Sequence, residues 1–238
     1  MSSSSVSTKS LFQISETVEL AVIATPPQTV PDIIEDCGKH GIKAAVIITA
    51  GFSETGATGR ALEHAVLENA RRYGIRLLGP NCLGIMRPAI GLNATFNKGG
   101  ANSGNLAFVS QSGALCTAIL DWAQSNDVGF SSVVSLGSSA DVDFGEILDY
   151  LVTDQQTQNI LLYIEGIRNA RSFMSSLRAA ARIKPVILVK VGRHAAGSKA
   201  AMSHTASLVG SDDAFDAAVR RAGVVRVQTI TQLFSAAK

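Results

Sequence analysis

Short, almost continuous apolar runs alternate with segments of helical periodicity along most of the chain. Residues 18–25 form the first such run, which is typical of a strand buried on both faces. In residues 59–74 the apolar side chains recur at helical spacing, and Gly74 stands where a helix would end. This alternation predicts an α/β protein, in which parallel strands joined by right-handed helical crossovers build doubly wound sheets.

The alternation occurs in two blocks separated by a segment of different composition. The first block, residues 18–81, contains three predicted strands and two helices. Residues 82–104 are rich in Gly and Asn without a long period, which indicates a linker or a loose hairpin between domains. The second block, residues 105–238, contains about five predicted strands, enough for a complete flavodoxin-like sheet. We therefore expect two domains of parallel strands with helices on both faces.

The first block is short for a nucleotide-binding fold. Such a fold usually has two three-stranded halves, and its phosphate-binding glycine turn follows the first strand. Residues 1–17 contain no strand–turn–helix of that kind and indicate a polar, disordered leader. The sequence therefore predicts only the C-terminal half of a Rossmann-like domain over residues 18–81. The last predicted helix is also cut at Lys238, so we expect a fragment or a shortened version of a longer protein.

The composition excludes several classes of function. Of the 238 residues, 46% are hydrophobic and only 5% aromatic, a balance that suits parallel sheets covered by helices. The net charge of +2 favours neither nucleic acid nor an anionic membrane. No apolar run reaches the ~18 residues of a membrane span, and the polar start lacks the apolar core of a secretion signal. The three cysteines have no metal-ligand spacing, which indicates a cytoplasmic protein without disulfides.

Ligands bind to open α/β sheets at the carboxyl ends of the strands. In the segment SQSG, Ser112 and Gly113 lie between a buried strand and an amphipathic helix. The free N–H groups and positive dipole end of a helix at this position favour a phosphate group. The alternative is that Ser112 only caps the helix, which is the commoner role of serine there. The next strand ends near Gly137, which allows the backbone to approach a ligand closely.

Two acidic residues, Asp141 and Asp143, follow Gly137 at the start of the next helix. Such carboxylates could hold a metal ion. Their favourable interaction with the helix dipole, and a capping box of Asp143 with Glu146, explain them fully. We therefore predict no metal site.

A carboxylate and an imidazole complete the candidate chemistry. Glu165 follows five apolar residues, so it must be solvated or paired at the strand end. His204 lies in a segment from Gly192 to Asp213 whose small residues would allow a loop to move. A carboxylate fixes the tautomer of a neighbouring imidazole and supports its positive charge. The set indicates nucleophilic attack of His204 on a phosphoryl group, the alternative being that His204 is an ordinary loop residue. We expect His194, close to the preceding strand, to be a spectator.

The strands of the first block end in small turns that contain Gly or Pro. Their backbone donors could contact a ligand, although ordinary turn chemistry explains the same residues equally well. These turns are Thr25–Pro27, Thr49–Gly56 and Gly79–Gly84.

Four segments together resemble the NDP-forming acyl-CoA synthetase family, which includes ADP-forming acetyl-CoA synthetases and, more distantly, the α subunit of succinyl-CoA synthetase. The segments are RLLGPNCLGI, FVSQSGAL, YIEG and SHTASLVGSDDAFDAAVRRAGVVRV, in the right order on the expected strand ends. The resemblance covers roughly Val18 to the C-terminus. The stretches LNATF and ILDWAQ look most like large bacterial proteins that fuse such a region to a GNAT acetyltransferase domain.

The resemblance implies a role for each candidate residue. His204 matches the phosphorylated histidine, Glu165 the glutamate that supports it, and Ser112 with Gly113 the phosphate-binding helix end. The first block would bind CoA, and the second would be the succinyl-CoA-ligase-like flavodoxin domain. The turns that bind CoA would include Thr25, Pro26, Thr49, Ala50, Gly51, Phe52 and Asn81.

In the family reaction, acyl-CoA and phosphate give acyl phosphate, whose phosphoryl group moves to the histidine and then to ADP. The nucleotide and Mg²⁺ bind at a separate ATP-grasp domain. The resemblance therefore implies the ligase activity of an ADP-forming acetate–CoA ligase, incomplete without an ATP-grasp partner. A second hypothesis is a non-catalytic, acyl-CoA-sensing region of a protein lysine acetyltransferase, and the presence of His204 and Glu165 favours the first. A generic flavodoxin-like interaction domain, the third hypothesis, would not need the His204 segment.

Overall fold

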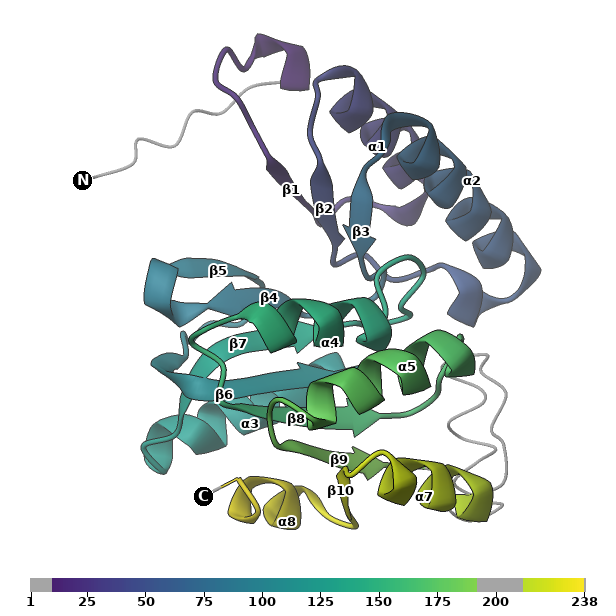
Figure 1. Ribbon diagram of the computed structural model, residues 1–238. Helices are drawn as coiled ribbons and strands as arrows, with labels where there is room; N and C mark the ends of the chain where they lie inside the picture. Colours follow the sequence, from purple (N-terminus) through teal and green to yellow (C-terminus); the bar gives the residue numbers. More distant parts are fainter. Residues whose placement is uncertain (1–9, 192–211, 238) are drawn as a thin grey trace.

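The computed structural model describes residues 10–191 and 212–237, which form two sheets with helices packed on them (Figure 1). The strands of the first sheet are all parallel and lie in the order in which they follow along the chain. Crossovers that are all right-handed and all advance in one direction place their helices on the same side of a sheet. The first sheet consists of β1 (Leu20–Ile23), β2 (Ala44–Ile47) and β3 (Arg76–Leu78), with α1 (Val30–Lys39) and α2 (Ala57–Tyr73) on one face.

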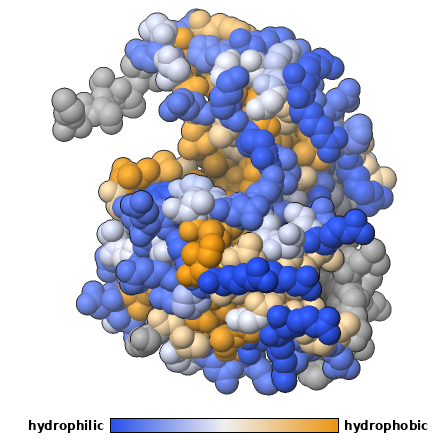
Figure 2. All heavy atoms as spheres, in the orientation of Figure 1, coloured by the Kyte–Doolittle hydropathy of each residue, from blue (hydrophilic) through white to orange (hydrophobic). Residues whose placement is uncertain are grey.

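The other face of the first sheet turns toward the second sheet. Val46 and Leu78 point to this side and belong to the core that lies under the helices of the second sheet. Figure 2 shows hydrophobic side chains in the hollow between the two sheets. The helices of the first sheet therefore cover only one of its faces.

Part of the expected leader contacts the core. Leu11–Gln13 form a 3-10 turn, η1, in which the hydroxyl of Ser10 accepts the N–H of Phe12 at 3.3 Å. Leu11 packs against the core of the first sheet. Core contacts therefore begin before Val18, where the first block was expected to start, while residues 1–9 lie outside the described part of the chain.

The second sheet contains five parallel strands in the order β10-β9-β8-β6-β7. Numbered from β6, this is the 2-1-3-4-5 order of flavodoxin-like sheets. The chain steps from β6 to β7 on one side and then returns past β6 to β8 on the other. The strands are β6 (Asn102–Ser110), β7 (Gly129–Ser135), β8 (Asn159–Ile164), β9 (Val186–Lys190) and β10 (Val225–Val227).

The segment expected as a linker or loose hairpin is a hairpin that belongs to the second sheet. Its strands, β4 (Gly84–Arg87) and β5 (Leu92–Thr95), pair antiparallel, with the short 3-10 turn η4 (Pro88–Ile90) between them. β4 also pairs antiparallel with β7 and so extends the parallel sheet at that edge.

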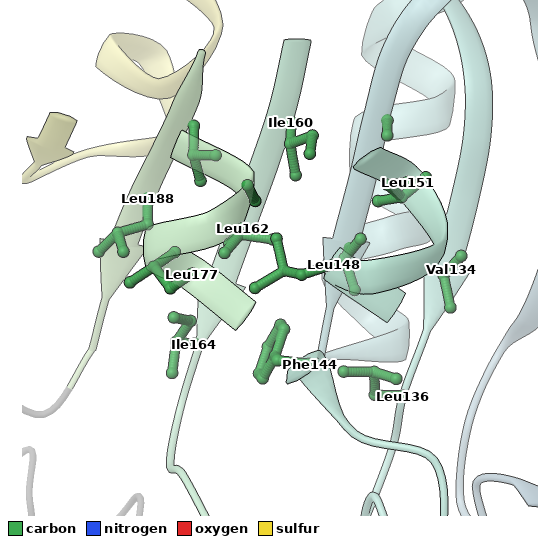
Figure 3. Close-up of a cluster of buried hydrophobic side chains, with 14 of the residues drawn as sticks. Val134, Leu136, Phe144, Leu148, Leu151, Ile160, Leu162, Ile164, Leu177 and Leu188 are labelled. Atoms are coloured by element: carbon green, nitrogen blue, oxygen red, sulfur yellow. The ribbon is translucent and has the colours of Figure 1, made fainter. Parts of the chain in front are cut away.

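Helices cover both faces of the second sheet because its strand order reverses at β6. Helix α3 (Gly113–Ser125) and the short α8 (Ile230–Ser235) pack on one face. The opposite face carries α4 (Phe144–Thr153), α5 (Ala170–Ala181) and α7 (Asp212–Arg221). Figure 3 shows Leu148 of α4 and Leu177 of α5 within the cluster that includes Leu162 of β8.

Side chains alternate across β8 with the two-residue period of a strand. Leu162 and Ile164 point to the α4 and α5 face, and Leu161 and Tyr163 to the α3 face. The same alternation directs residue 165, the first after β8, toward the α3 face.

The two sheets meet where β3 lies beside the start of α4. Arg76 pairs with Asp141 at 3.0 Å and also with Glu146, and the N–H of Leu77 donates to Asp141 at 2.8 Å. Asp143 caps α4 in a capping box with Glu146, as the sequence predicts. Asp141 therefore joins the two sheets instead of acting only on the helix dipole.

The turn after β3 and the turn after β7 pack backbone against backbone. The N–H groups of Ser138 and Ala140 donate to the carbonyl oxygens of Pro80 and Gly79 at 2.9 and 3.0 Å. Gly137 has a φ of +54°, and a Cβ there would lie 2.3 Å from the Pro80 oxygen. Only glycine fits this contact.

Replacing Gly137 by alanine tests this contact. The substitution adds left-handed backbone strain and a clash with neighbouring carbonyl oxygens, so we expect it to lower the free energy of unfolding by ~2–5 kcal/mol. Urea denaturation followed by circular dichroism measures the change.

Gly223→Ala is the matched control, because Gly223 also has a positive φ of +79° but nothing within 4 Å of a new Cβ. We expect this variant to lose only about 1 kcal/mol, the cost of backbone strain alone. Equal losses in the two variants would show that the close approach at Gly137 does not matter.

Candidate functional site

A cavity of about 390 Å³ lies at the carboxyl end of the second sheet. It opens between the ends of β6 and β8, where the strand order reverses, which is the place at which open α/β sheets bind ligands. Five of its lining residues have roles predicted from the sequence, and Gln111 and Ser138 have none. The lining consists of Asn81, Gln111, Ser112, Gly113, Gly137, Ser138 and Glu165.

The N-terminus of α3 forms one wall of the cavity. Ser112 is the N-cap residue, and its hydroxyl accepts the N–H of Leu115 at 3.3 Å. The hydroxyl of Ser110 in turn accepts the N–H of Ser112 at 3.0 Å. Helix α3 has 13 residues and no acidic residue in its first turn. Its positive end therefore faces the cavity uncompensated by its own side chains, and Ser112 both caps the helix and lines the cavity.

Glu165 forms a second wall of the cavity. Burial raises the pKa of Tyr163, two residues earlier on the same face of the sheet, and the negative charge of Glu165 raises it further. The backbone of Glu165 is held by Gln111, whose side-chain oxygen accepts the Glu165 N–H at 2.7 Å. The cavity therefore combines a carboxylate with the positive end of a helix.

The third wall is the contact between the turns after β3 and β7. Asn81 adopts a left-handed conformation with a φ of +56°, and its N–H donates to Thr49 at 3.0 Å. Asn81 is one of the residues predicted from the sequence to bind CoA. The structure places it in the cavity with Ser112 and Glu165, because its turn bonds to the turn that contains Gly137 and Ser138.

The other residues expected to bind CoA lie at the carboxyl ends of β1 and β2, and none of them lines this cavity. The Thr49 hydroxyl donates to the Thr25 carbonyl at 2.7 Å and so joins the two turns. The N–H of Gly51 donates to Glu54 at 2.7 Å. Thr25, Pro26 and Ala50 are exposed, and Thr49 and Gly51 are partly exposed.

Phe52 differs from this group. Its side chain has no exposed surface and packs in the core of the first sheet. The aromatic ring therefore contributes to the core of the first sheet, and its contact with CoA stays a prediction.

His204 and His194 lie outside the described residues, so their predicted roles stay predictions. Within residues 10–191 and 212–237, no group of three His, Cys, Asp or Glu side chains could hold a metal ion. In the same part of the chain, no helix is both long and apolar enough to cross a membrane.

An ion pair that the sequence analysis missed connects α2 with the loop after β8. A guanidinium nitrogen of Arg168 lies 3.3 Å from a carboxylate oxygen of Glu63. Glu63 is only 8% exposed and Arg168 follows Glu165 by three residues. This pair ties the loop that contains Glu165 to the first sheet. No sequence signal indicates it, because the partners are 105 residues apart.

Comparison with known proteins identifies two family models in the chain. A model described as "CoA binding domain" matches residues 5–88, and one described as "Succinyl-CoA ligase like flavodoxin domain" matches residues 103–238. Among solved structures, the Ca. Korarchaeum cryptofilum dinucleotide forming acetyl-coenzyme A synthetase 1, in complex with phosphate and ADP, is similar with a TM-score of 0.90. It is 38% identical, and the match covers 95% of this chain and 49% of that one.

Two curated relatives are acetate–CoA ligases (ADP-forming). One, from Archaeoglobus fulgidus, is 46% identical over 94% of this chain and 33% of its own length. The other, an alpha subunit from Pyrococcus furiosus, is 42% identical over 97% of this chain and 50% of its own length. The chain thus spans a third to a half of the length of these two relatives.

Two buried thiols give a test by pH. Burial raises the pKa of both Cys82 and Cys116 to about 12, from an ordinary 9.0. The folded state then keeps thiol protons that the unfolded state loses, so this contribution is complete below pH 9 and is lost as the pH rises toward 12. We expect the free energy of unfolding to fall in this window by up to about 1.4 kcal/mol per pH unit for each thiol.

The measurement is urea denaturation at several pH values, with the Cys82→Ala, Cys116→Ala double variant as the control. The double variant should be less stable at neutral pH but should show a shallower decline above pH ~9. Parallel declines in the two proteins would mean that these thiols do not titrate as their burial requires.

Proposed function

This chain belongs to the family defined by the succinyl-CoA ligase like flavodoxin domain, whose model matches more than half of it, and on that premise we propose that it is the alpha-like portion of an NDP-forming acyl-CoA synthetase. It would pass a phosphoryl group between acyl phosphate and ADP by way of a phosphohistidine at His204. In this proposal residues 18–81 contribute to CoA binding and residues 105–238 to phosphoryl transfer.

The observation that carries the proposal is the cavity between the ends of β6 and β8, where the strand order reverses. Its lining includes Glu165, the N-terminus of the 13-residue helix α3 and the glycine turn at Gly137. A phosphate group would be stabilised by the N–H groups and dipole of α3. An imidazole that attacks phosphorus becomes positively charged, and a carboxylate such as Glu165 stabilises that charge.

Each step has a residue to perform it. In the direction of ATP synthesis, phosphate held at Ser112 attacks the thioester of acyl-CoA and forms acyl phosphate, with CoA as the leaving group. The neutral imidazole of His204 then attacks phosphorus, and the carboxylate of the acyl group leaves. Glu165 would accept a hydrogen bond from the other ring N–H and so fix the tautomer with a free lone pair toward phosphorus.

The partners follow from the same proposal. ADP and Mg²⁺ would bind at an ATP-grasp domain or subunit, which accepts the phosphoryl group from His204. We propose acetate as the acyl group because the two curated relatives described above are named acetate–CoA ligases. The reaction belongs in the cytoplasm, where ADP, phosphate and CoA are present.

The comparisons give no support to the second hypothesis, an acyl-CoA-sensing region of a protein lysine acetyltransferase. The relatives reported above are named as ligases or synthetases, and the two family models are a CoA binding domain and a succinyl-CoA ligase like flavodoxin domain.

Phosphorylation of His204 is the decisive test. We expect acetyl phosphate labelled with ³²P to transfer its label to the chain, and labelled ATP with Mg²⁺ and an ATP-grasp partner to do the same. The label should be acid-labile and base-stable, as for a phosphoramidate, and His204→Ala should abolish it. Scintillation counting after gel separation measures the transfer.

His194→Ala is the matched control, since it removes the other histidine of the same segment and should label like the unaltered protein. An unlabelled wild-type chain, or equal labelling of His204→Ala, would refute the phosphohistidine.

Glu165→Gln tests the supporting carboxylate. The substitution keeps size and removes the charge that stabilises the imidazolium, so we expect roughly 10- to 100-fold slower labelling, the range for loss of a group that orients a histidine. Circular dichroism should show an unchanged fold. The control is Glu68→Gln, which alters an exposed carboxylate on α2. Unchanged labelling in Glu165→Gln would exclude this role.

A further inference from the structure

Gln111 occupies the point where β6 ends and α3 begins. It follows Ser110, the last residue of β6, and precedes Ser112, the N-cap of α3. Its side chain is only 8% exposed, although it lines the cavity. A buried amide group needs hydrogen-bond partners for both its oxygen and its nitrogen.

The loop after β8 supplies those partners. The side-chain oxygen of Gln111 accepts the N–H of Glu165 at 2.7 Å and the N–H of Gly166 at 3.0 Å. The side-chain nitrogen donates to the carbonyl of Gly166 at 2.9 Å. One planar amide thus binds three backbone groups of two successive residues: the N–H of Glu165 and both the N–H and the carbonyl of Gly166.

These bonds continue the pairing of two strands beyond the place where their backbones separate. β6 and β8 are neighbours up to Ser110 and Tyr163, and the backbone N–H of Gln111 donates to Tyr163 at 3.3 Å. Beyond this point the chain from β6 enters α3, so its backbone no longer reaches the loop. The Gln111 side chain replaces the missing backbone partner.

On the basis of the proposed function, we propose that Gln111 is a positioning residue for phosphoryl transfer, because it fixes the backbone of Glu165 and thereby holds the carboxylate on the α3 side of the sheet. The role requires an acceptor and a donor on one rigid group. Methionine has the length of glutamine but neither function, and glutamate has the acceptor but, when ionised, no donor.

A role in fold stability alone would predict different consequences. A side chain that acts through Glu165 matters for the reaction only while Glu165 is present. A side chain that merely stabilises the sheet, or that binds phosphate directly, acts independently of Glu165. The two cases are separated by a double-mutant cycle and by the affinity for phosphate.

The first measurement is amide hydrogen exchange of the protein followed by NMR, which does not depend on catalytic activity. We expect the Glu165 and Gly166 amides to be protected in the unaltered protein and to exchange at least about tenfold faster in Gln111→Met, while the Leu162 amide of β8 stays protected. Gln111→Glu, which keeps the acceptor, should retain protection of both amides. Continued protection in Gln111→Met would overturn the proposal.

The second measurement is the labelling rate from acetyl phosphate. We expect Gln111→Met to slow labelling at least about tenfold, with the dissociation constant of inorganic phosphate changed less than about threefold, because the end of α3 is intact. In the Glu165→Gln background the same substitution should cause no further loss. Gln124→Met, at an exposed glutamine of α3, is the control and should label normally.

The outcomes distinguish failure of the positioning role of Gln111 from failure of the proposed phosphoryl transfer. Full additivity in the double variant, or a large loss of phosphate affinity, would refute positioning and leave the phosphohistidine standing. Absence of label in the unaltered protein would refute the proposed function, and with it any role of Gln111 in phosphoryl transfer, whereas the exchange rates would still show whether Gln111 holds the loop.

Discussion

The reversal of strand order at β6 is the constraint on which the rest of the structure depends. The crossover from β6 to β7 runs in one direction, and those from β7 past β6 to β8 and on to β9 run in the other. Right-handed crossovers therefore place α3 on one face of the sheet and α4 with α5 on the other. The segments that leave β6 and β8 therefore diverge to opposite faces. The cavity between them is a direct consequence of chain order, and it receives the N-terminus of α3 and the carboxylate of Glu165.

Where the segments after β6 and β8 diverge, their backbone groups can no longer bond to each other. Nearby groups of the molecule supply the missing hydrogen bonds. Gln111 bonds to the backbone of Glu165 and Gly166. On the neighbouring side, carbonyl oxygens of the turn after β3 accept hydrogen bonds from N–H groups of the turn after β7, which brings Asn81 to the cavity. The first sheet thus takes part in the site of the second, and the Glu63–Arg168 pair adds a link from α2 to the loop of Glu165.

Local patterns allowed much of the fold to be predicted. The apolar runs at β6 to β9, the end of α2 at Gly74 and the capping box of α4 depend on residues a few positions apart. The location of Ser112, Gly113, Gly137 and Glu165 at one edge follows from the same patterns, since parallel strands end together. The direction of a turn side chain does not follow from these patterns: Phe52, beside the end of β2, packs in the core of the first sheet.

The sequence by itself determined the alternation of strands and helices, the helix caps and the residues that stand at the strand ends, because these depend on periodicity and on neighbours within a helical turn. Only the tertiary structure decided which strand ends share a cavity and what holds them. Asn81, which is predicted to bind CoA, lines the cavity, and the Gln111 side chain bonds to the backbone of Glu165, 54 residues away. Both depend on how two separate segments pack, and the free energy of such packing is spread over the whole sheet and has no signature in the local pattern of either segment.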